Sequence, residues 1–103
     1  MVEVIVMPSA IQDIKSIIKY VHKQSVQNAE KLQLEMTEKI ASLRSFAERG
    51  SLVKEIISPQ LREVKLYHYR IIYRCTENNV QVITVHHSSR LLINNTHLND
   101  LIE

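Results

Sequence analysis

With 103 residues, the chain has room for one domain, because a packed domain typically takes about 100 to 150 residues. Apolar residues make up 45% of the chain and charged residues 23%, which is ordinary globular composition and excludes an intrinsically disordered or membrane protein. The formal charge of +2 is too small for a general polyanion binder, the single glycine excludes a glycine-rich phosphate loop, and the single cysteine excludes an internal disulfide. We expect a cytoplasmic protein, since the first residues lack the features of a signal peptide.

The first segments in chain order predict a strand and a helix. Met1–Met7 is a β-branched run, mostly apolar on both faces, which is typical of an interior or well-covered strand, and Pro8 ends it. Ser9 and Gln12 form a capping-box pattern, so a helix is expected to begin at about Ser9. Apolar residues then recur every three or four positions, at Ala10, Ile14, Ile17, Ile18 and Val21.

A second helix follows Ser25, which is placed to cap it. The helix is expected to run to Gly50, a residue that suits the left-handed position after a helix end. Its apolar stripe consists of Ala29, Leu32, Met36, Ile40, Leu43 and Ala47. Two amphipathic helices joined at Ser25 predict a helical hairpin.

From Ser51 the apolar period changes from helical to alternating. The predicted strands are Arg62–Tyr67, Tyr69–Cys75 and Val80–His87, with a tight turn at residues 77–79. Because side chains alternate along a strand, one face of the middle strand carries Arg70, Ile72 and Arg74, and the other carries Tyr69, Ile71, Tyr73 and Cys75.

The last segment, Thr96–Glu103, has apolar residues at helical spacing, but it is long enough for only about two turns and should be helical only when docked. Ser58, Pro59 and Gln60 are expected to form a loop. We therefore predict a single domain over residues 1–103 of the α+β class. A small antiparallel or mixed sheet is covered on one face by the N-terminal helical hairpin, in the order β-α-α-β-β-β with a short C-terminal helix.

Polar residues that could carry chemistry collect in the second half. Between Arg62 and Arg90, five Lys or Arg residues and three histidines accompany only two acids. This composition fits a basic sheet face for phosphate or for an acidic protein partner, and it fits equally well the solvated face of a half-exposed sheet. The candidates are Lys54, Glu55, Arg62, Glu63, Lys65, His68, Arg70, Arg74, His86, His87 and Arg90.

Other chemistry has little support. His86 and His87 are adjacent, would point to opposite faces of a strand and cannot ligate one metal together, so no metal site is expected. No cofactor-binding motif is present, and no cofactor is expected. Cys75 is most simply a small buried hydrophobic residue. The strand tyrosines could stack on bases, but their alternation favours the sheet core; they are Tyr67, Tyr69 and Tyr73.

Two segments in a fixed order, YRIIYR at residues 69–74 and VHHSSR at residues 85–90, resemble the RelE/ParE superfamily of toxins from bacterial type II toxin-antitoxin modules, also called plasmid stabilisation proteins. The resemblance covers nearly the whole chain, because four further segments also match. They are the strand ending in a proline, the isoleucine-rich helix, the long helix before Gly50 and the segment LREV at residues 61–64. The family fold is a small antiparallel sheet covered on one face by a helical hairpin, in agreement with the periodicities.

The resemblance implies one of two activities. RelE-like members are ribosome-dependent endoribonucleases that cut mRNA, whereas ParE-like members block DNA gyrase and lack the catalytic set. RNA cleavage requires a group that activates the 2′-hydroxyl and cations that stabilise the charge on the scissile phosphate. In this alternative, resemblance assigns Arg70, Lys65 and Arg90 to the phosphate, with Glu55 or His86 as the base.

Departures from the ribonuclease pattern favour the ParE branch. Glu63 occupies the place of a second strand lysine, Ser88 and Asn94 occupy the places of a basic residue and an aromatic one, and no tyrosine follows His87. We therefore expect no catalytic residues and a toxin that inhibits gyrase, with the ribonuclease as the alternative. A second alternative is an inactive family member that acts only as antitoxin partner and co-repressor.

The resemblance also implies partners. A cognate antitoxin should fold its C-terminal segment along the toxin, and operator DNA should be contacted only through that antitoxin. The target is gyrase, or the ribosome and mRNA in the alternative, and no membrane is involved. The helical hairpin and the C-terminal residues are the expected gyrase contacts. The expected partner-binding residues are Arg70, Arg74, His87, Arg90, Leu98 and Leu101.

Overall fold

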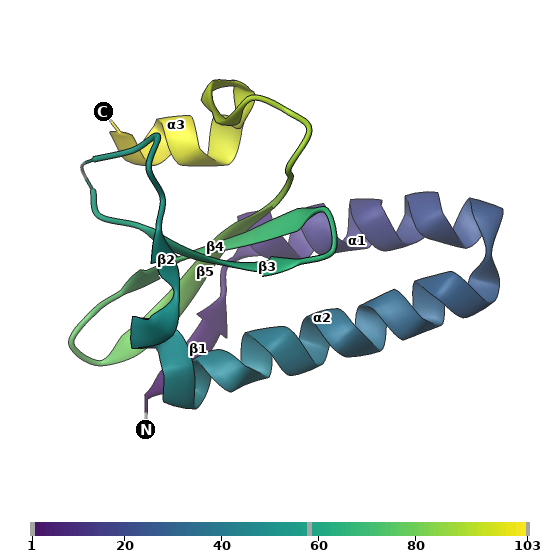
Figure 1. The fold of residues 1–103 in the computed structure, drawn as a ribbon, viewed down its shortest axis with the longest axis horizontal. Helices are drawn as coiled ribbons and strands as arrows, with labels where there is room; N and C mark the ends of the chain where they lie inside the picture. Colours follow the sequence, from purple (N-terminus) through teal and green to yellow (C-terminus); the bar gives the residue numbers. More distant parts are fainter. Residues whose placement is uncertain (1, 58, 103) are drawn as a thin grey trace.

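The computed structural model describes residues 2–57 and 59–102 and confirms the predicted α+β class. The elements are β1 (Glu3–Val6), α1 (Pro8–Gln24), α2 (Val26–Phe46), β2 (Ser51–Leu52), β3 (Arg62–Leu66), β4 (Tyr69–Cys75), β5 (Asn79–His87) and α3 (Thr96–Ile102), with single 3-10 turns at Ala47–Arg49 and Leu92–Asn94 (Figure 1). Met1, Ser58 and Glu103, which belong to the predicted first strand, loop and tail, lie outside the described residues.

The strands form one mixed sheet in the order β1-β5-β4-β3-β2. β1 pairs with β5 in parallel, and the remaining neighbours pair antiparallel. β2, only two residues long, was not foreseen. Of the two predicted alternatives for the first strand, the interior one is wrong, because β1 lies at the sheet edge. Its apolar residues are explained by the hairpin, since Val4 and Val6 pack against the core beneath it.

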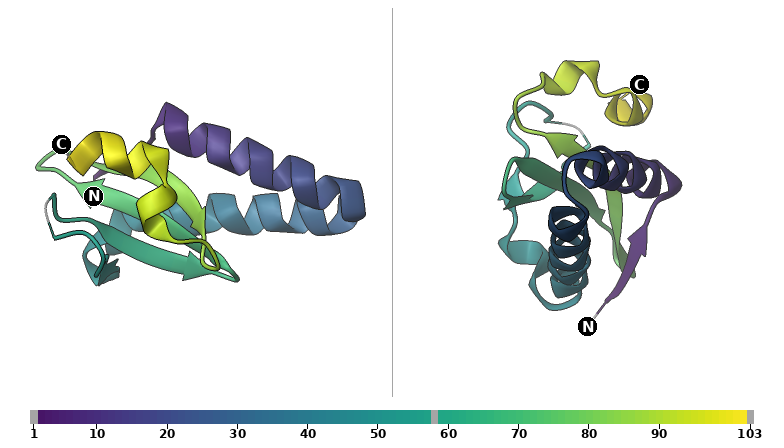
Figure 2. Two further views of the ribbon diagram at one scale, coloured as in Figure 1. Left: turned by 90° about the horizontal axis from the view of Figure 1, so that it is seen from above. Right: turned by 90° about the vertical axis from the view of Figure 1, so that its right-hand side faces the viewer.

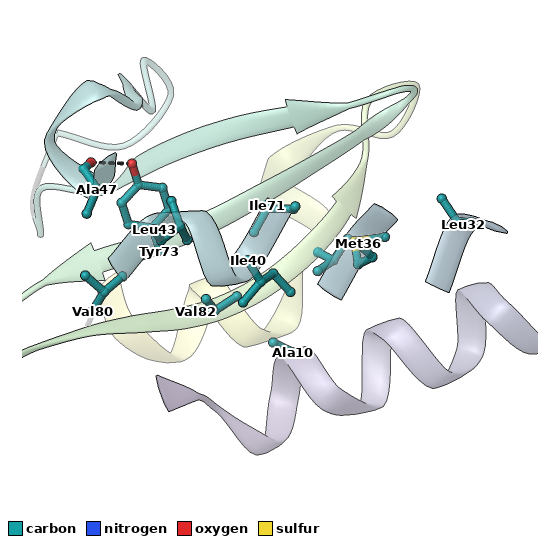
Figure 3. Packing of buried hydrophobic residues seen from close by; sticks show 11 residues of the cluster. Ala10, Leu32, Met36, Ile40, Leu43, Ala47, Ile71, Tyr73, Val80 and Val82 are labelled. Carbon is teal, nitrogen blue, oxygen red and sulfur yellow. Dashed lines mark hydrogen bonds between the residues drawn. The ribbon is translucent and has the colours of Figure 1, made fainter. Parts of the chain in front are cut away.

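The helical hairpin covers one face of the sheet. The predicted apolar stripe of α2 is buried there, with Met36, Ile40 and Leu43 packed against Ile71 and Tyr73 of β4 (Figure 3). Burial of each such side chain contributes roughly 1.5–3 kcal/mol. The turn between the helices projects beyond the sheet, so the far end of the hairpin has no strand beneath it (Figures 1 and 2).

A second core covers the opposite face. Ile72 and Ile83 of the sheet pack there with Leu61, Leu92 and Leu98. A bulge makes this possible, because Ile72 pairs with Thr84 while Tyr73 pairs with Val82, and Ile83 is the extra residue. α3 is docked through Leu98, whose side chain is fully buried, and this accounts for a helix of seven residues that would not be stable alone.

The starts of the two long helices differ in how they are capped. Ser25 caps α2 as predicted, since its hydroxyl accepts a bond of 3.1 Å from the amide of Asn28. The predicted capping box at Ser9 is wrong. α1 begins at Pro8, a good first helical residue, and the Ser9 hydroxyl instead donates to the carbonyl of Ile83, which ties α1 to β5.

Gly50 is not in the left-handed conformation, so that prediction is wrong. Its φ is −65°, and α2 ends earlier, at Phe46, before the 3-10 turn. The physical reason for glycine is space. The hydroxyl of Tyr73 donates to the carbonyl of Ala47 (Figure 3). The same hydroxyl occupies the place where a Cβ at position 50 would lie.

The predictions that Cys75 is buried and that Tyr67 lies in the sheet core are wrong, and the turns explain why. Cys75 ends β4 and is exposed, because the next strand begins only at Asn79 and the hairpin loop starts beside it. Tyr67 is 60% exposed, since it occupies the β3–β4 turn with a φ of 54°, rather than a strand position. Of the three strand tyrosines, only Tyr73 is fully buried.

Candidate functional site

Arg70 lies at the centre of the candidate basic face. The sheet register places Lys65 of β3 and His86 of β5 on either side of it. As the alternation predicted, Arg70 lies on the face of β4 opposite Ile71 and Tyr73. Arg70 is not free to bind a ligand on this face, however, because acidic side chains form hydrogen bonds with it.

Two carboxylates clamp the guanidinium of Arg70. Glu63 of β3 accepts from Nε at 2.6 Å and from Nη2 at 2.7 Å, and Glu55, from the loop before β3, accepts from Nη1 at 2.8 Å and from Nη2 at 2.9 Å. Both contacts are bidentate, which is the strongest geometry for this pair of groups. The cluster therefore carries two negative charges against one positive charge.

The hydrogen bonds of the clamp shift the pKa values of Glu55 and Arg70. Hydrogen bonding to Arg70 lowers the pKa of Glu55 to about 2, against an opposing effect of burial. Hydrogen bonds to Glu63 and then to Glu55 raise the pKa of Arg70 above its ordinary value. A general base works best with a pKa near the operating pH, so Glu55 is poorly suited to that task.

His86 is held by two hydrogen bonds. Its Nε2 lies 2.9 Å from the carbonyl oxygen of Arg90, and its Nδ1 lies 3.0 Å from the side-chain nitrogen of Asn95. Because a carbonyl only accepts, the network assigns the proton to Nε2 and leaves Nδ1 as the acceptor. Both ring nitrogens are therefore engaged, and the residue is buried. Neither atom is free to take a proton from a substrate.

Asp13 of α1 is a central residue that the sequence prediction missed. Its Oδ2 accepts from the Thr84 hydroxyl and from the amide of Val85 at 3.1 Å, and its Oδ1 lies 3.2 Å from Nε2 of His97. One carboxylate thus joins α1, β5 and α3. A signal was present, because Asp13 is the only acid in α1 and stands three residues after the buried Ala10.

The remaining predicted residues do not converge on Arg70. Arg74 donates to the side-chain oxygen of Gln81 at 2.6 Å, and Lys65 is exposed. Leu98 is buried in the second core and Leu101 packs against it, so contact between Leu98 and a partner would require α3 to lift. The role of these residues in partner binding stays a prediction.

His87 and Arg90 lie apart from the clamp. The ring of His87 packs edge-on against Tyr69, with ring centroids 5.4 Å apart, on the hairpin side of the sheet. Arg90 is exposed in the turn after β5. The structure therefore divides the predicted basic residues between two places.

Within residues 2–57 and 59–102, no three histidine, cysteine or acidic side chains come together as metal ligands. In the same part of the chain, no helix has both the length and the apolar character needed to cross a bilayer.

Comparison with known families gives a match over residues 4–92 to the family described as ParE toxin of type II toxin-antitoxin system, parDE. The chain belongs to this ParE toxin family. The predicted ParE branch of the superfamily is thus confirmed. The matched range contains the hairpin and the strands of the sheet apart from Glu3, the first residue of β1, and it ends before α3.

Among solved structures, the ParE fold is similar to a chain of the chromosomal ParDE toxin-antitoxin system from P. aeruginosa. The TM-score is 0.73 at 17% sequence identity, and the similarity covers 84% of this chain and 96% of the other. At this identity the similarity establishes a shared fold. A search of curated proteins gives no significant match.

Proposed function

We propose that this ParE-family chain is a toxin that inhibits DNA gyrase by surface recognition, without catalysis, and is neutralised by a cognate antitoxin. The observation that supports the proposal most strongly is the clamp of Arg70 between Glu55 and Glu63. Arg70 is the residue that a ribonuclease of this superfamily would use on the scissile phosphate.

The clamp works against phosphate chemistry in two ways. Transition-state stabilisation requires cations that converge on the phosphate, but here the donors of Arg70 are spent on two carboxylates. A phosphate at this place would also meet a cluster with net negative charge. The two candidate bases give no help, since Glu55 has a pKa of about 2 and His86 is engaged through both ring nitrogens.

The antitoxin partner is supported by family membership and by the surface of α1. Three lysines, Lys15, Lys19 and Lys23, border a shallow groove whose floor includes Ile14 and Ile18. A groove of this kind suits an amphipathic segment with acidic residues. The similar P. aeruginosa structure is described as a ParDE toxin-antitoxin system.

Expression of the chain in growing cells, followed by DNA and RNA analysis, separates the alternatives. A gyrase-directed toxin should arrest growth, relax or linearise plasmid DNA and leave translated messages intact. Discrete cuts within translated messages would instead support the ribosome-dependent ribonuclease. Normal growth with a well-folded chain would support the inactive co-repressor.

Lys65→Ala is the matched variant for this experiment. Lys65 is exposed and belongs to the ribonuclease residue set, so its loss should leave the fold intact and remove a phosphate contact only if one is used. The proposal predicts undiminished growth arrest. Loss of arrest in this variant would contradict it.

A further inference from the structure

A cavity of about 520 Å³ lies between α1 and the ends of β4 and β5. α1 contributes Ser16 and Tyr20, the strands contribute Tyr69 and His87, and the turn after β5 contributes Arg90. The cavity is distinct from the Arg70 clamp, because Tyr69 packs on the hairpin side of the sheet and Arg70 on the other side. No residue of this cavity takes part in the clamp.

The single acid that lines the cavity is already committed. Asp13 uses Oδ2 for Thr84 and Val85 and Oδ1 for His97, so both of its carboxylate oxygens already have hydrogen-bond partners within the fold. Arg90 has no carboxylate within 4 Å among the described residues. Of these two charged side chains, only Arg90 is left without a side-chain partner among the described residues.

Several other polar groups at the cavity can donate a hydrogen bond to a ligand. His87 Nδ1 accepts the amide of Ser89 at 3.1 Å and lies 2.7 Å from the Ser89 hydroxyl, so a neutral ring carries its proton on Nε2. The hydroxyls of Tyr20 and Tyr69 have no hydrogen-bond partner in the part of the chain that the structure describes. Donors that surround one free cation favour an anion.

We propose that this cavity binds the carboxylate of an aspartate or glutamate side chain presented by a peptide segment. A single guanidinium matches the single charge of a carboxylate and can hold it with two parallel hydrogen bonds, whereas a phosphate dianion would leave about one charge unbalanced. The rings of Tyr20 and Tyr69 and the side chain of Ile17 supply apolar walls, which suit an aromatic residue beside the acid.

This inference goes beyond the proposed function, because it depends only on the groups that line the cavity. A gyrase-directed toxin could lack such a site, and an inactive family member could possess it. The experiment below contains neither gyrase nor antitoxin, so its result leaves the proposed function to be tested separately.

The test is an NMR titration of the whole chain with the dipeptide N-acetyl-Asp-Phe-amide. The amides of Ser89 and Arg90 should shift with a dissociation constant on the order of 1 mM. N-acetyl-Asn-Phe-amide has the same shape without the charge and should bind about tenfold more weakly, because it cannot form a charge-assisted pair. Inorganic phosphate should also bind more weakly than the acidic dipeptide.

Variants assign the effect to the cavity. Arg90→Gln should weaken the acidic dipeptide about tenfold, and the exposed position makes loss of the fold unexpected. Arg44→Gln, which removes an exposed arginine from α2, is the matched control and should change nothing. Tyr20→Phe removes one donor and should weaken binding by a smaller factor.

Several results would overturn the inference. These are equal affinity for the two dipeptides, tighter binding of phosphate than of the acidic dipeptide, an equal effect of the Arg44 and Arg90 variants, or no shift at any amide of the cavity up to about 50 mM dipeptide.

Discussion

Arg70 stabilises this ParE fold through ion pairs with two carboxylates. Glu63 reaches it from the neighbouring strand, and Glu55 reaches it from a loop that has no regular structure. The alternation of β4 predicted the face on which Arg70 lies. The ion pair with Glu55 could not be predicted, because the path of the loop before β3 follows no periodicity. The arginine that most suggested phosphate chemistry in the sequence therefore joins a loop to the sheet.

Arg70→Ala should destabilise the protein by about 3 kcal/mol, because Glu63 is buried and would lose the one cation that it contacts among the described residues. Urea denaturation measures the change. Lys65→Ala is the control, since this exposed neighbour should change stability by less than about 0.5 kcal/mol. Adding Glu63→Gln to Arg70→Ala should recover part of the loss, and an equal loss in the single and double variants would contradict the account.

Glu55 should make stability depend on acid pH. Its pKa is about 2 in the folded chain and 4.5 as the ordinary value, so the stabilisation is complete above about pH 5 and is lost as pH falls towards 2. Because about half of the side chain is exposed, water screens the pair and the effect should be on the order of 1 kcal/mol.

The comparison of wild type with Glu55→Gln isolates this effect from other titrating groups. Urea unfolding at pH 5.5 should show the wild type as the more stable protein, and the difference should shrink at pH 3. A difference that stays constant between the two pH values would show that the ion pair contributes nothing.

At the scale of elements, the apolar stripes of α1 and α2 and the alternation of β4 predicted the first core well, because periodicity reports directly which face is buried. The second core was harder to predict, since it depends on a bulge at Ile83 and on docking of the tail through Leu98. Gly50 shows the same limit. Glycine is required at this position because Tyr73, which is distant in sequence, fills the space of a Cβ. The backbone angle of Gly50 itself does not require a glycine.

Gly50→Ala should destabilise the fold by roughly 1–3 kcal/mol through overpacking against Tyr73. Tyr73→Phe alone should cost about 1 kcal/mol for the lost bond to Ala47. In the double variant the loss should be less than the sum of the two single losses, because removal of the hydroxyl relieves the closest contact of the methyl group. The contacts with Cζ of residue 73 at 2.9 Å and with the carbonyl oxygen of Glu63 at 3.0 Å remain, so only part of the loss should be recovered. Thermal or urea unfolding completes the cycle, and strict additivity would contradict the steric explanation.

Leu98→Ala should release α3, because the helix is too short to persist without its anchor in the second core. The expected loss is about 2–4 kcal/mol, together with fast hydrogen exchange at residues 98–102. Leu91→Ala is the control, since that side chain is 71% exposed. Continued slow exchange in α3 of the Leu98 variant would show that docking does not depend on this side chain.

At the scale of the whole molecule, the small net charge conceals an uneven distribution. Glu55 and Glu63 are bound to Arg70 and Asp13 is hydrogen-bonded within the fold, whereas Lys15, Lys19, Lys23 and Arg90 border the groove and the cavity beside α1. The sequence was equally compatible with a basic sheet face and with a solvated one. In the structure, two carboxylates bind the central arginine of that face. This distribution suits recognition of acidic protein surfaces better than attack on an RNA phosphate.

The most direct measurement combines purified gyrase, supercoiled plasmid and the purified chain, with the cognate antitoxin added in half of the samples. The account predicts lost supercoiling activity or linear, protein-linked DNA, reversal by the antitoxin, and full potency of Lys65→Ala. Unchanged gyrase activity in a large excess of folded wild-type chain, with cleavage of ribosome-bound mRNA by the same preparation, would contradict it.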